Sequence, residues 1–245
     1  MLIVFAYEFP HWKTFNGLAR MLSIGVKPDL VLGAPWVDLK IPTSYNPIRK
    51  NINSTHLPDL KEVAKNFGIP VVISKHNDLT IEKLLAQLKP ELGIILGARI
   101  LSKSIISSFK LGIINTHPGL LPSNRGLDNL EKAILKKIPQ GVTTHFIDSR
   151  IDMGRCIDAS ILNIYEDDSF AEIQMRLNEL QIEKLIHTLT LWKEGIYIKS
   201  TPLSFSKYTS KLDLNELNDA LLEFSMYKKE YQNIISEYKA NDYLN

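Results

Sequence analysis

Three residues in the middle of the chain carry groups suited to proton transfer beside a reacting carbonyl: Asn115, His117 and Asp152. Asn115 and His117 are two positions apart directly after an apolar run, so in an extended backbone their side chains project the same way. Asp152 precedes Gly154, which marks a turn that would bring the carboxylate back toward His117. An amide, an imidazole and a carboxylate favour general acid–base catalysis at an acyl-type carbon, through a tetrahedral oxyanion. No Ser or Cys nucleophile stands beside them.

Each of these residues also has a purely structural interpretation. A histidine after a strand is often a structural or surface residue, and an asparagine before Pro-Gly often serves turn hydrogen bonding. Spacing alone leaves both interpretations open. If the group is catalytic, a nearby Asp152 carboxylate should favour the imidazolium and raise the pKa of His117 above its ordinary value near 6.5.

The elements that would position these residues alternate between strands and helices. This alternation predicts an α/β fold, a Rossmann-like open and mostly parallel sheet with helices on both faces. Ligands of such sheets bind beyond the carboxyl ends of the strands, where residues 115–119 would lie. The predicted strands are residues 2–6, 30–32, 71–73, 93–96 and 112–114, and the predicted helices are residues 12–23, 57–67, 80–88 and 102–109.

The pattern changes after residue 126. Helical spacing continues at 127–137, and residues 142–147 and 156–164 predict two strands that extend the sheet beyond its parallel part. A capped long helix is predicted from about residue 169 to about residue 192. We expect residues 1–195 to form the main domain and residues 196–245 a small helical C-terminal extension that serves packing or dimerisation.

Composition excludes several classes of protein. With 44% hydrophobic and 23% charged residues among 245, the chain is typical of a globular protein. A net charge of +2 without long basic blocks offers nucleic acid little to bind. The single cysteine, Cys156, favours a reducing compartment and is interpreted as a buried strand residue. No segment approaches the roughly 20 apolar residues of a membrane span. We therefore expect a cytoplasmic protein without a membrane or nucleic-acid partner.

Four ordered motifs resemble the folate-dependent formyltransferase family. Residues 115–126 read NTHPGLLPSNRG, similar to the family's N-x-H-P-(S/G)-x-L-P-x-x-R-G. Residues 141–147 read GVTTHFI, similar to G-x-T-x-H-F-(V/I), and residues 151–154 read IDMG, similar to (V/I)-D-x-G. Residues 97–102, GARILS, resemble the family's folate-pocket segment. The similarity covers roughly residues 93–164 and becomes fainter toward residue 1.

This resemblance implies roles for particular residues. The family's catalytic asparagine, histidine and aspartate fall on Asn115, His117 and Asp152, with N10-formyltetrahydrofolate as formyl donor and no metal. His145 also matches a family position, which we interpret as one that orients a loop. The residues expected to line the folate pocket are Arg99, Ile100, Leu101, Ile147, Asp148 and Asp152.

Features near the two ends of the chain narrow the choice among possible formyl acceptors. Glycinamide-ribonucleotide transformylases have a Gly/Ser/Asn-rich loop after the first strand, whereas residues 7–12 here read YEFPHW. The tail is short for the C-terminal barrel of methionyl-tRNA formyltransferases, and formyltetrahydrofolate hydrolases carry an N-terminal regulatory domain. We expect a sugar-nucleotide N-formyltransferase of bacterial O-antigen or lipopolysaccharide synthesis, acting on dTDP-4-amino-4,6-dideoxyglucose or a 3-amino isomer. The alternatives are a glycinamide-ribonucleotide or methionyl-tRNA formyltransferase, or a non-catalytic folate- or nucleotide-binding module.

Nucleotide contacts are predicted from strand ends and from aromatic residues. Basic and amide groups at strand ends would meet a pyrophosphate, and aromatic rings would stack on a pyrimidine. Exposed cations are usually solvated, however, and aromatic rings usually lie in the core. The residues concerned are Lys75, Asn77 and Arg125 for the pyrophosphate, and Tyr7 or Trp12, with Phe9 and Tyr208 as further candidates, for the base.

Overall fold

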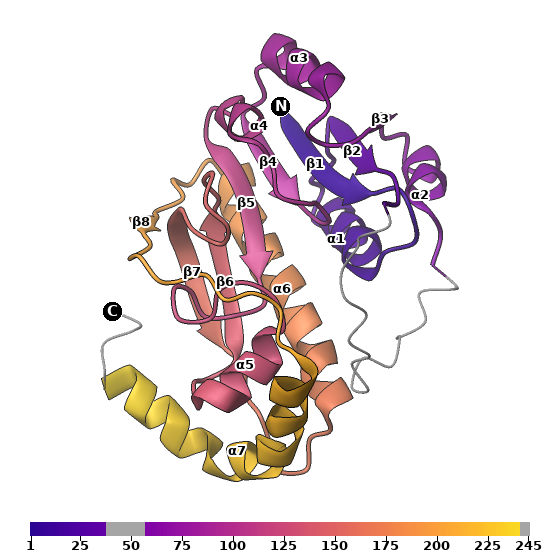
Figure 1. Ribbon diagram of the computed structural model, residues 1–245. Coiled ribbons are helices and arrows are strands. Elements are labelled where there is room, and N and C mark those ends of the chain that lie inside the picture. Colours follow the sequence, from indigo (N-terminus) through magenta and orange to yellow (C-terminus); the bar gives the residue numbers. More distant parts are fainter. Residues whose placement is uncertain (38–56, 241–245) are drawn as a thin grey trace.

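The computed structural model describes residues 1–37 and 57–240, with the side chain of residue 240 left out (Figure 1). Within these residues one eight-stranded sheet has the strand order β3-β2-β1-β4-β5-β6-β7-β8, with helices packed around it. The strands are β1 Leu2–Tyr7, β2 Leu30–Ala34, β3 Val71–Ile73, β4 Leu92–Ile95, β5 Gly112–His117, β6 Gly141–Phe146, β7 Arg155–Ile161 and β8 Thr201–Pro202. The helices are α1 Trp12–Ser23, α2 Leu60–Asn66, α3 Leu79–Leu88, α4 Lys103–Ser107, α5 Asn129–Lys136, α6 Phe170–Lys193 and α7 Leu214–Ala240.

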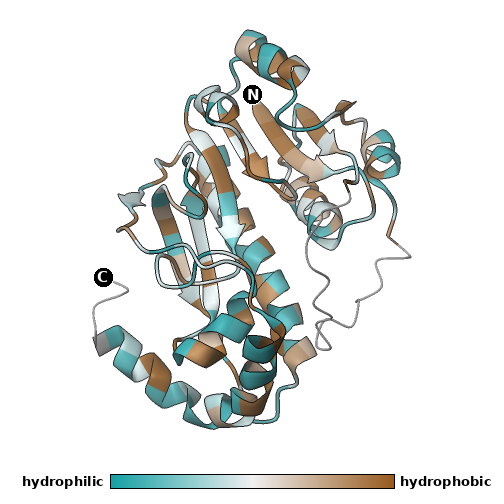
Figure 2. Ribbon diagram, in the orientation of Figure 1, coloured by the Kyte–Doolittle hydropathy of each residue, from teal (hydrophilic) through white to brown (hydrophobic). Residues whose placement is uncertain are grey.

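The first five strands in chain order pair in parallel and form the half of the sheet that carries helices on both faces. Alternate residues of β1 point to opposite faces: Val4 joins a core cluster with α1, α2 and α6, whereas Phe5 joins a cluster with α3 and α4. Both clusters are apolar, and Figure 2 shows β1 and β2 mostly in the hydrophobic colour. The predicted Rossmann-like α/β fold is confirmed.

The remaining strands extend the sheet in the antiparallel sense, from β5 through β6 and β7 to β8. The two strands predicted at 142–147 and 156–164 correspond to β6 and β7, and Cys156 is half-buried in β7. Strand β8 was not predicted, because two residues at a sheet edge form no alternating pattern.

Helix α6 passes beneath both halves of the sheet. Its N-terminus is fixed by a capping box between Ser169 and Glu172. Its first turns contribute Leu177 to a core cluster with α5 and α7, and its last turns contribute Leu185 to the cluster under β1 and β4. Gln181 is buried between these two apolar positions, so the helix presents a polar group where the two clusters meet.

The C-terminal segment packs closely against the rest of the chain. Helix α7 lies against α5, and the buried hydroxyl of Tyr231 donates to or accepts from backbone groups of Gln140 and Leu162 at 2.7–3.1 Å. Strand β8 pairs with β7. The boundary at 195/196 and a role of this segment in dimerisation remain predictions. No helix in the described ranges is long and apolar enough to cross a membrane.

Candidate active site

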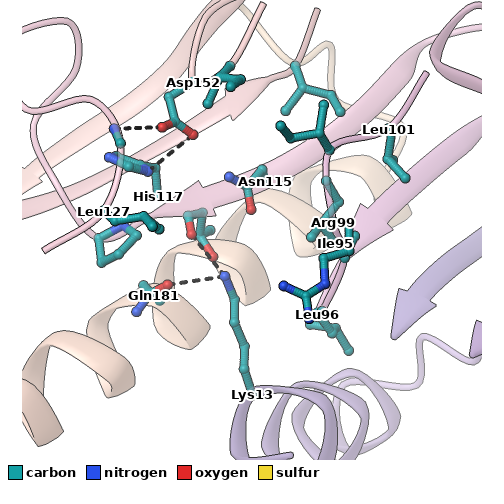
Figure 3. Close-up of a pocket in the computed structure, with 18 of the residues that line it drawn as sticks. Lys13, Ile95, Leu96, Arg99, Leu101, Asn115, His117, Leu127, Asp152 and Gln181 are labelled. Carbon is teal, nitrogen blue, oxygen red and sulfur yellow. Dashed lines mark hydrogen bonds and ion pairs between the residues drawn. The ribbon is translucent and has the colours of Figure 1, made fainter. Parts of the chain in front are cut away.

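The structure gathers the three residues singled out above at the carboxyl end of β5, where the sheet changes from parallel to antiparallel. Nδ1 of His117 lies 3.4 Å from Oδ1 of Asp152, and Asn115 lines the same pocket (Figure 3). Residues 115 and 117 are in one strand, so their side chains share a face of the sheet. Asp152 comes from the loop between β6 and β7.

A sharply turned loop places Asp152. Its own φ is +48°, and Gly154 has a φ of +110° at a point where a Cβ would collide with the carbonyl oxygen of Phe146. Oδ2 of Asp152 accepts a 2.8 Å hydrogen bond from the backbone N–H of Gly126, which leaves Oδ1 directed at His117. The carboxylate is thus held by backbone on one side and by the imidazole on the other.

His117 is buried, and its two ring nitrogens have different partners. Nε2 lies 2.8 Å from the carbonyl oxygen of Asn124, which can only accept, so Nε2 carries a hydrogen and Nδ1 faces Asp152. Burial lowers the pKa of His117, and the opposing effects of Asp152 and of the Asn124 carbonyl offset this only in part. The expectation that the pKa of His117 lies above its ordinary value is therefore wrong: Asp152 acts to raise it, but loss of water around the ring outweighs the carboxylate.

A second buried histidine fixes the orientation of Asn115. Nδ1 of His145 is 3.0 Å from the carbonyl oxygen of Met153, so it donates there, and Nε2 accepts from the amide of Asn115 at 3.3 Å. Burial lowers the pKa of His145 to about 4, so the ring is neutral at neutral pH. One N–H of the Asn115 amide is held by this ring, and its other N–H has no hydrogen-bond partner among the residues that the structure describes.

The pocket around these groups has a volume of about 700 Å³. Every residue predicted for the folate pocket lines it, together with apolar side chains that suit a flat aromatic ring system. Tyr7 also lines it, as does Tyr208. In the part of the chain described, no group of three or more His, Cys, Asp or Glu residues is arranged to hold a metal ion. The lining residues that matter here are Tyr7, Ile95, Leu96, Arg99, Ile100, Leu101, Asn115, His117, Ile147, Asp148, Asp152 and Tyr208.

Several residues predicted to contact a nucleotide lie elsewhere. Asn77 uses both ends of its amide on the loop after β4: it donates to the carbonyl of Ile100 at 2.8 Å and accepts from the N–H of Ser102 at 2.9 Å. Lys75 is exposed, Trp12 begins α1, and neither is among the residues lining the pocket. Asn77 therefore shapes the predicted folate segment rather than offering a pyrophosphate ligand.

Arg125 is also committed to the protein's own backbone. It is buried, and its guanidinium donates to the carbonyl oxygens of Ile151 and Ser206. The predicted pyrophosphate contact is replaced by a structural one, because these donors hold the loop of Asp152 against the C-terminal segment. The partners are 26 and 81 residues away in sequence, so no local pattern indicated them.

The pocket residues that were not anticipated from the sequence include Lys13, near the start of α1, and Gln181 in α6. The Lys13 ammonium donates to the carbonyl oxygen of Thr116 at 2.9 Å and to Oε1 of Gln181 at 3.1 Å (Figure 3). The available signal was the polar residue at 181, which interrupts the apolar spacing of α6.

Comparison with known proteins agrees with this architecture. The model of the formyl transferase family matches residues 55–189, more than half of the chain. This chain belongs to the formyl transferase family. Within that family, methionyl-tRNA formyltransferase from Thermodesulfovibrio yellowstonii is 33% identical over 143 residues, which is 57% of this chain and 46% of that protein. The chain thus spans about half the length of the curated formyl transferases it matches.

Solved formyl transferases share the fold. An N-formyltransferase from Helicobacter canadensis, in complex with folinic acid and dTDP-3-aminofucose, is 22% identical with a TM-score of 0.63 and covers 91% of this chain and 80% of its own. Phosphoribosylglycinamide formyltransferase from Anaplasma phagocytophilum is 17% identical with a TM-score of 0.60. The match covers 86% of this chain and 99% of that protein's chain. At these identities the likeness establishes the fold that the pocket is built on.

Proposed function

We propose that this chain moves a formyl group from N10-formyltetrahydrofolate to the amine of a nucleotide-linked amino sugar, with Asn115, His117 and Asp152 as catalytic residues. The main support for the proposal is that residues distant in sequence lie around one cavity. The eight residues matched to the family's folate pocket and catalytic group, with Asp152 in both sets, line one cavity, although they come from three separate stretches of sequence.

The folate pocket fits the donor in shape and chemistry. Residues 99–101 and the loop at 147–152 line the cavity, and apolar residues such as Ile95 and Leu96 line it too. A pterin needs backbone donors and acceptors at its edge and apolar contact on its faces. When bound, the folate supplies a formyl group on a nitrogen that leaves as an amine.

Asn115 and His117 would do different work on the reacting carbonyl. The N–H of Asn115 not held by His145 is directed at the oxygen that gains negative charge as the acceptor amine attacks. Nδ1 of His117, neutral because of burial, accepts the proton that the amine releases, and Asp152 stabilises the imidazolium so formed. The same proton is then returned to the departing folate nitrogen.

Support for a sugar-nucleotide acceptor is structural. The H. canadensis enzyme shares the fold over 91% of this chain and was solved with a dTDP-linked amino sugar. Near the pocket, Tyr7 stacks on Phe9 with ring centroids 4.8 Å apart, and Phe9 packs edge-on against Trp36 at 5.0 Å. Trp36 is 65% exposed, so this row of rings ends on a surface where a nucleobase would stack. We place dTDP-4-amino-4,6-dideoxyglucose first and a dTDP-3-amino isomer second.

A methionyl-tRNA acceptor is the second candidate, because the curated relatives quoted above are methionyl-tRNA formyltransferases. A tRNA acceptor would require binding that weakens steeply with salt, since phosphate contacts release counterions. A sugar nucleotide, with two phosphates, would show a much shallower salt dependence.

The test is an acceptor panel assayed with N10-formyltetrahydrofolate. We expect the mass of one formyl group to appear on a dTDP-4-amino or dTDP-3-amino sugar, and on neither glycinamide ribonucleotide nor methionyl-tRNA. Formylation of methionyl-tRNA alone would replace the proposed acceptor. Absence of transfer to every amine, with folate still bound in calorimetry, would reduce the protein to a binding module.

A further inference from the structure

Lys13 is a half-buried cation whose ammonium lies against the backbone of the reaction centre. Its ammonium bonds the carbonyl of Thr116, the residue between Asn115 and His117. It also bonds Oε1 of Gln181, the polar position of α6 where the two core clusters meet. One side chain thus ties α1, β5 and α6 together at the point where the proposed catalytic residues leave the sheet (Figure 3).

The charge of Lys13 has no counter-ion among the described residues. Its hydrogen-bond partners are two neutral oxygens, and no carboxylate within the described ranges comes within ion-pair distance. Burial accordingly lowers the pKa of Lys13 to about 7. An ammonium removed from water without a carboxylate is costly, so a chain that retains one gains little stability from it. This points to a role in the site rather than in the fold.

The unbalanced charge acts on the neighbouring titratable groups. Burial is the main cause of the lowered pKa values of His117 on β5, His145 on β6 and His11 at the start of α1, and the Lys13 charge lowers each of them further. Lys132 of α5 pushes His117 in the same direction, and Asp152 pushes it in the opposite one. The two cations around His117 therefore act to lower its pKa, and the one carboxylate acts to raise it.

We propose that Lys13 is a positioning residue of the reaction centre: it holds the peptide between Asn115 and His117 in place and, when protonated, sets a positive charge beside that imidazole. The expected effect on kcat rests on the proposed function. The expected effect on the titration of His117 does not depend on which acceptor the protein uses.

Two substitutions separate the effect of the Lys13 hydrogen bonds from the effect of its charge. Lys13→Met keeps most of the volume and removes both the hydrogen bonds and the charge, whereas Gln181→Glu keeps the bond to Thr116 and places a carboxylate against the ammonium. Lys27→Met, on an exposed lysine in the turn after α1, is the matched control. His117 is followed by NMR titration of its ring protons, and formyl transfer by kcat and by acceptor KM.

For Lys13→Met we expect His117 to titrate at higher pH and kcat to fall roughly 10- to 100-fold with acceptor KM little changed, as for a misplaced reacting group. For Gln181→Glu we expect the same upward titration shift with kcat within a few-fold of the wild type at its new optimum. Lys27→Met should change neither the titration of His117 nor kcat.

Other outcomes would overturn the proposal. An unchanged His117 titration in both variants would remove the electrostatic role, even if no acceptor is ever found. A rise in acceptor KM with kcat unchanged would make Lys13 a substrate contact instead. If Lys13→Met does not fold, Gln181→Glu carries the test, and an unchanged His117 titration in that variant would refute the proposal.

Discussion

At the scale of single residues, two histidines on neighbouring strands differ in what their partners allow. His117 presents Nδ1 to a carboxylate in the pocket, whereas His145 has Nδ1 on the Met153 carbonyl and Nε2 on Asn115. Both have lowered pKa values because both are buried. Only His117 has a nitrogen that can exchange a proton with a ligand, so it is the residue we assign to proton transfer.

Replacing His117 by Asn should therefore abolish turnover and spare folate binding. Loss of a positioned general base commonly costs about 10²- to 10⁴-fold in rate, and we expect kcat to fall within that range. The donor's dissociation constant, measured by calorimetry, should change by less than about threefold, since the pterin contacts come from other segments. His187→Asn, at an exposed histidine of α6, should behave like the wild type. Retained turnover in the His117 variant would exclude it as the base.

The motif positions could be predicted from sequence, but the surroundings of their side chains could not. Asn115, His117 and Asp152 stand in local patterns, and the strand ends were readable from apolar runs. The direction of the His117 pKa shift depends on burial of the ring and, to a smaller extent, on the charges of Lys13 and Lys132, which only folding brings near it. The contacts of Arg125 and Asn77 are with backbone atoms distant in sequence, which leave no trace in residue type.

At the scale of elements, the loop after β4 depends on a residue outside it. Replacing Asn77 by Ala removes both hydrogen bonds that hold Ile100 and Ser102. We expect KM for the folate donor to rise several-fold with kcat nearly unchanged, because the loop borders the donor and not the attacking amine. Steady-state kinetics with varied donor measures this, and Lys83→Ala on the exposed side of α3 is the control. A fall in kcat at unchanged KM would contradict this placement of the loop.

One buried hydroxyl of α7, that of Tyr231, contributes hydrogen bonds to the docking of this helix. Tyr231→Phe leaves the backbone of Gln140 and Leu162 short of a partner, so the free energy of unfolding should fall by about 1–3 kcal/mol. Urea unfolding followed by circular dichroism measures the change. Tyr197→Phe, at a side chain 78% exposed, should stay within about 0.5 kcal/mol of the wild type. Equal effects of the two substitutions would show that the α7 hydroxyl contributes nothing specific.

At the scale of the whole molecule, buried neutral histidines make stability depend on pH. His145 titrates near 6.5 when unfolded and at about 4 when folded, so between these values the unfolded chain binds more protons. The free energy of unfolding should therefore fall as pH decreases through this window, with His145 alone contributing about 3 kcal/mol. His145→Asn, which retains a donor for the Met153 carbonyl, should flatten the slope. An equally steep slope in that variant would assign the effect to other groups.

The long helix α6 has a mechanical consequence for this family member. It runs 24 residues without Pro or Gly and is embedded in the apolar clusters of both halves of the sheet. Kinks usually need a proline, a glycine or a bulge, so hinging the two halves would mean bending an intact rod or unpacking its buried side chains. Substrate access should then involve local loop rearrangement, and crystals grown without ligand should tolerate soaking with folate without cracking or a change of cell.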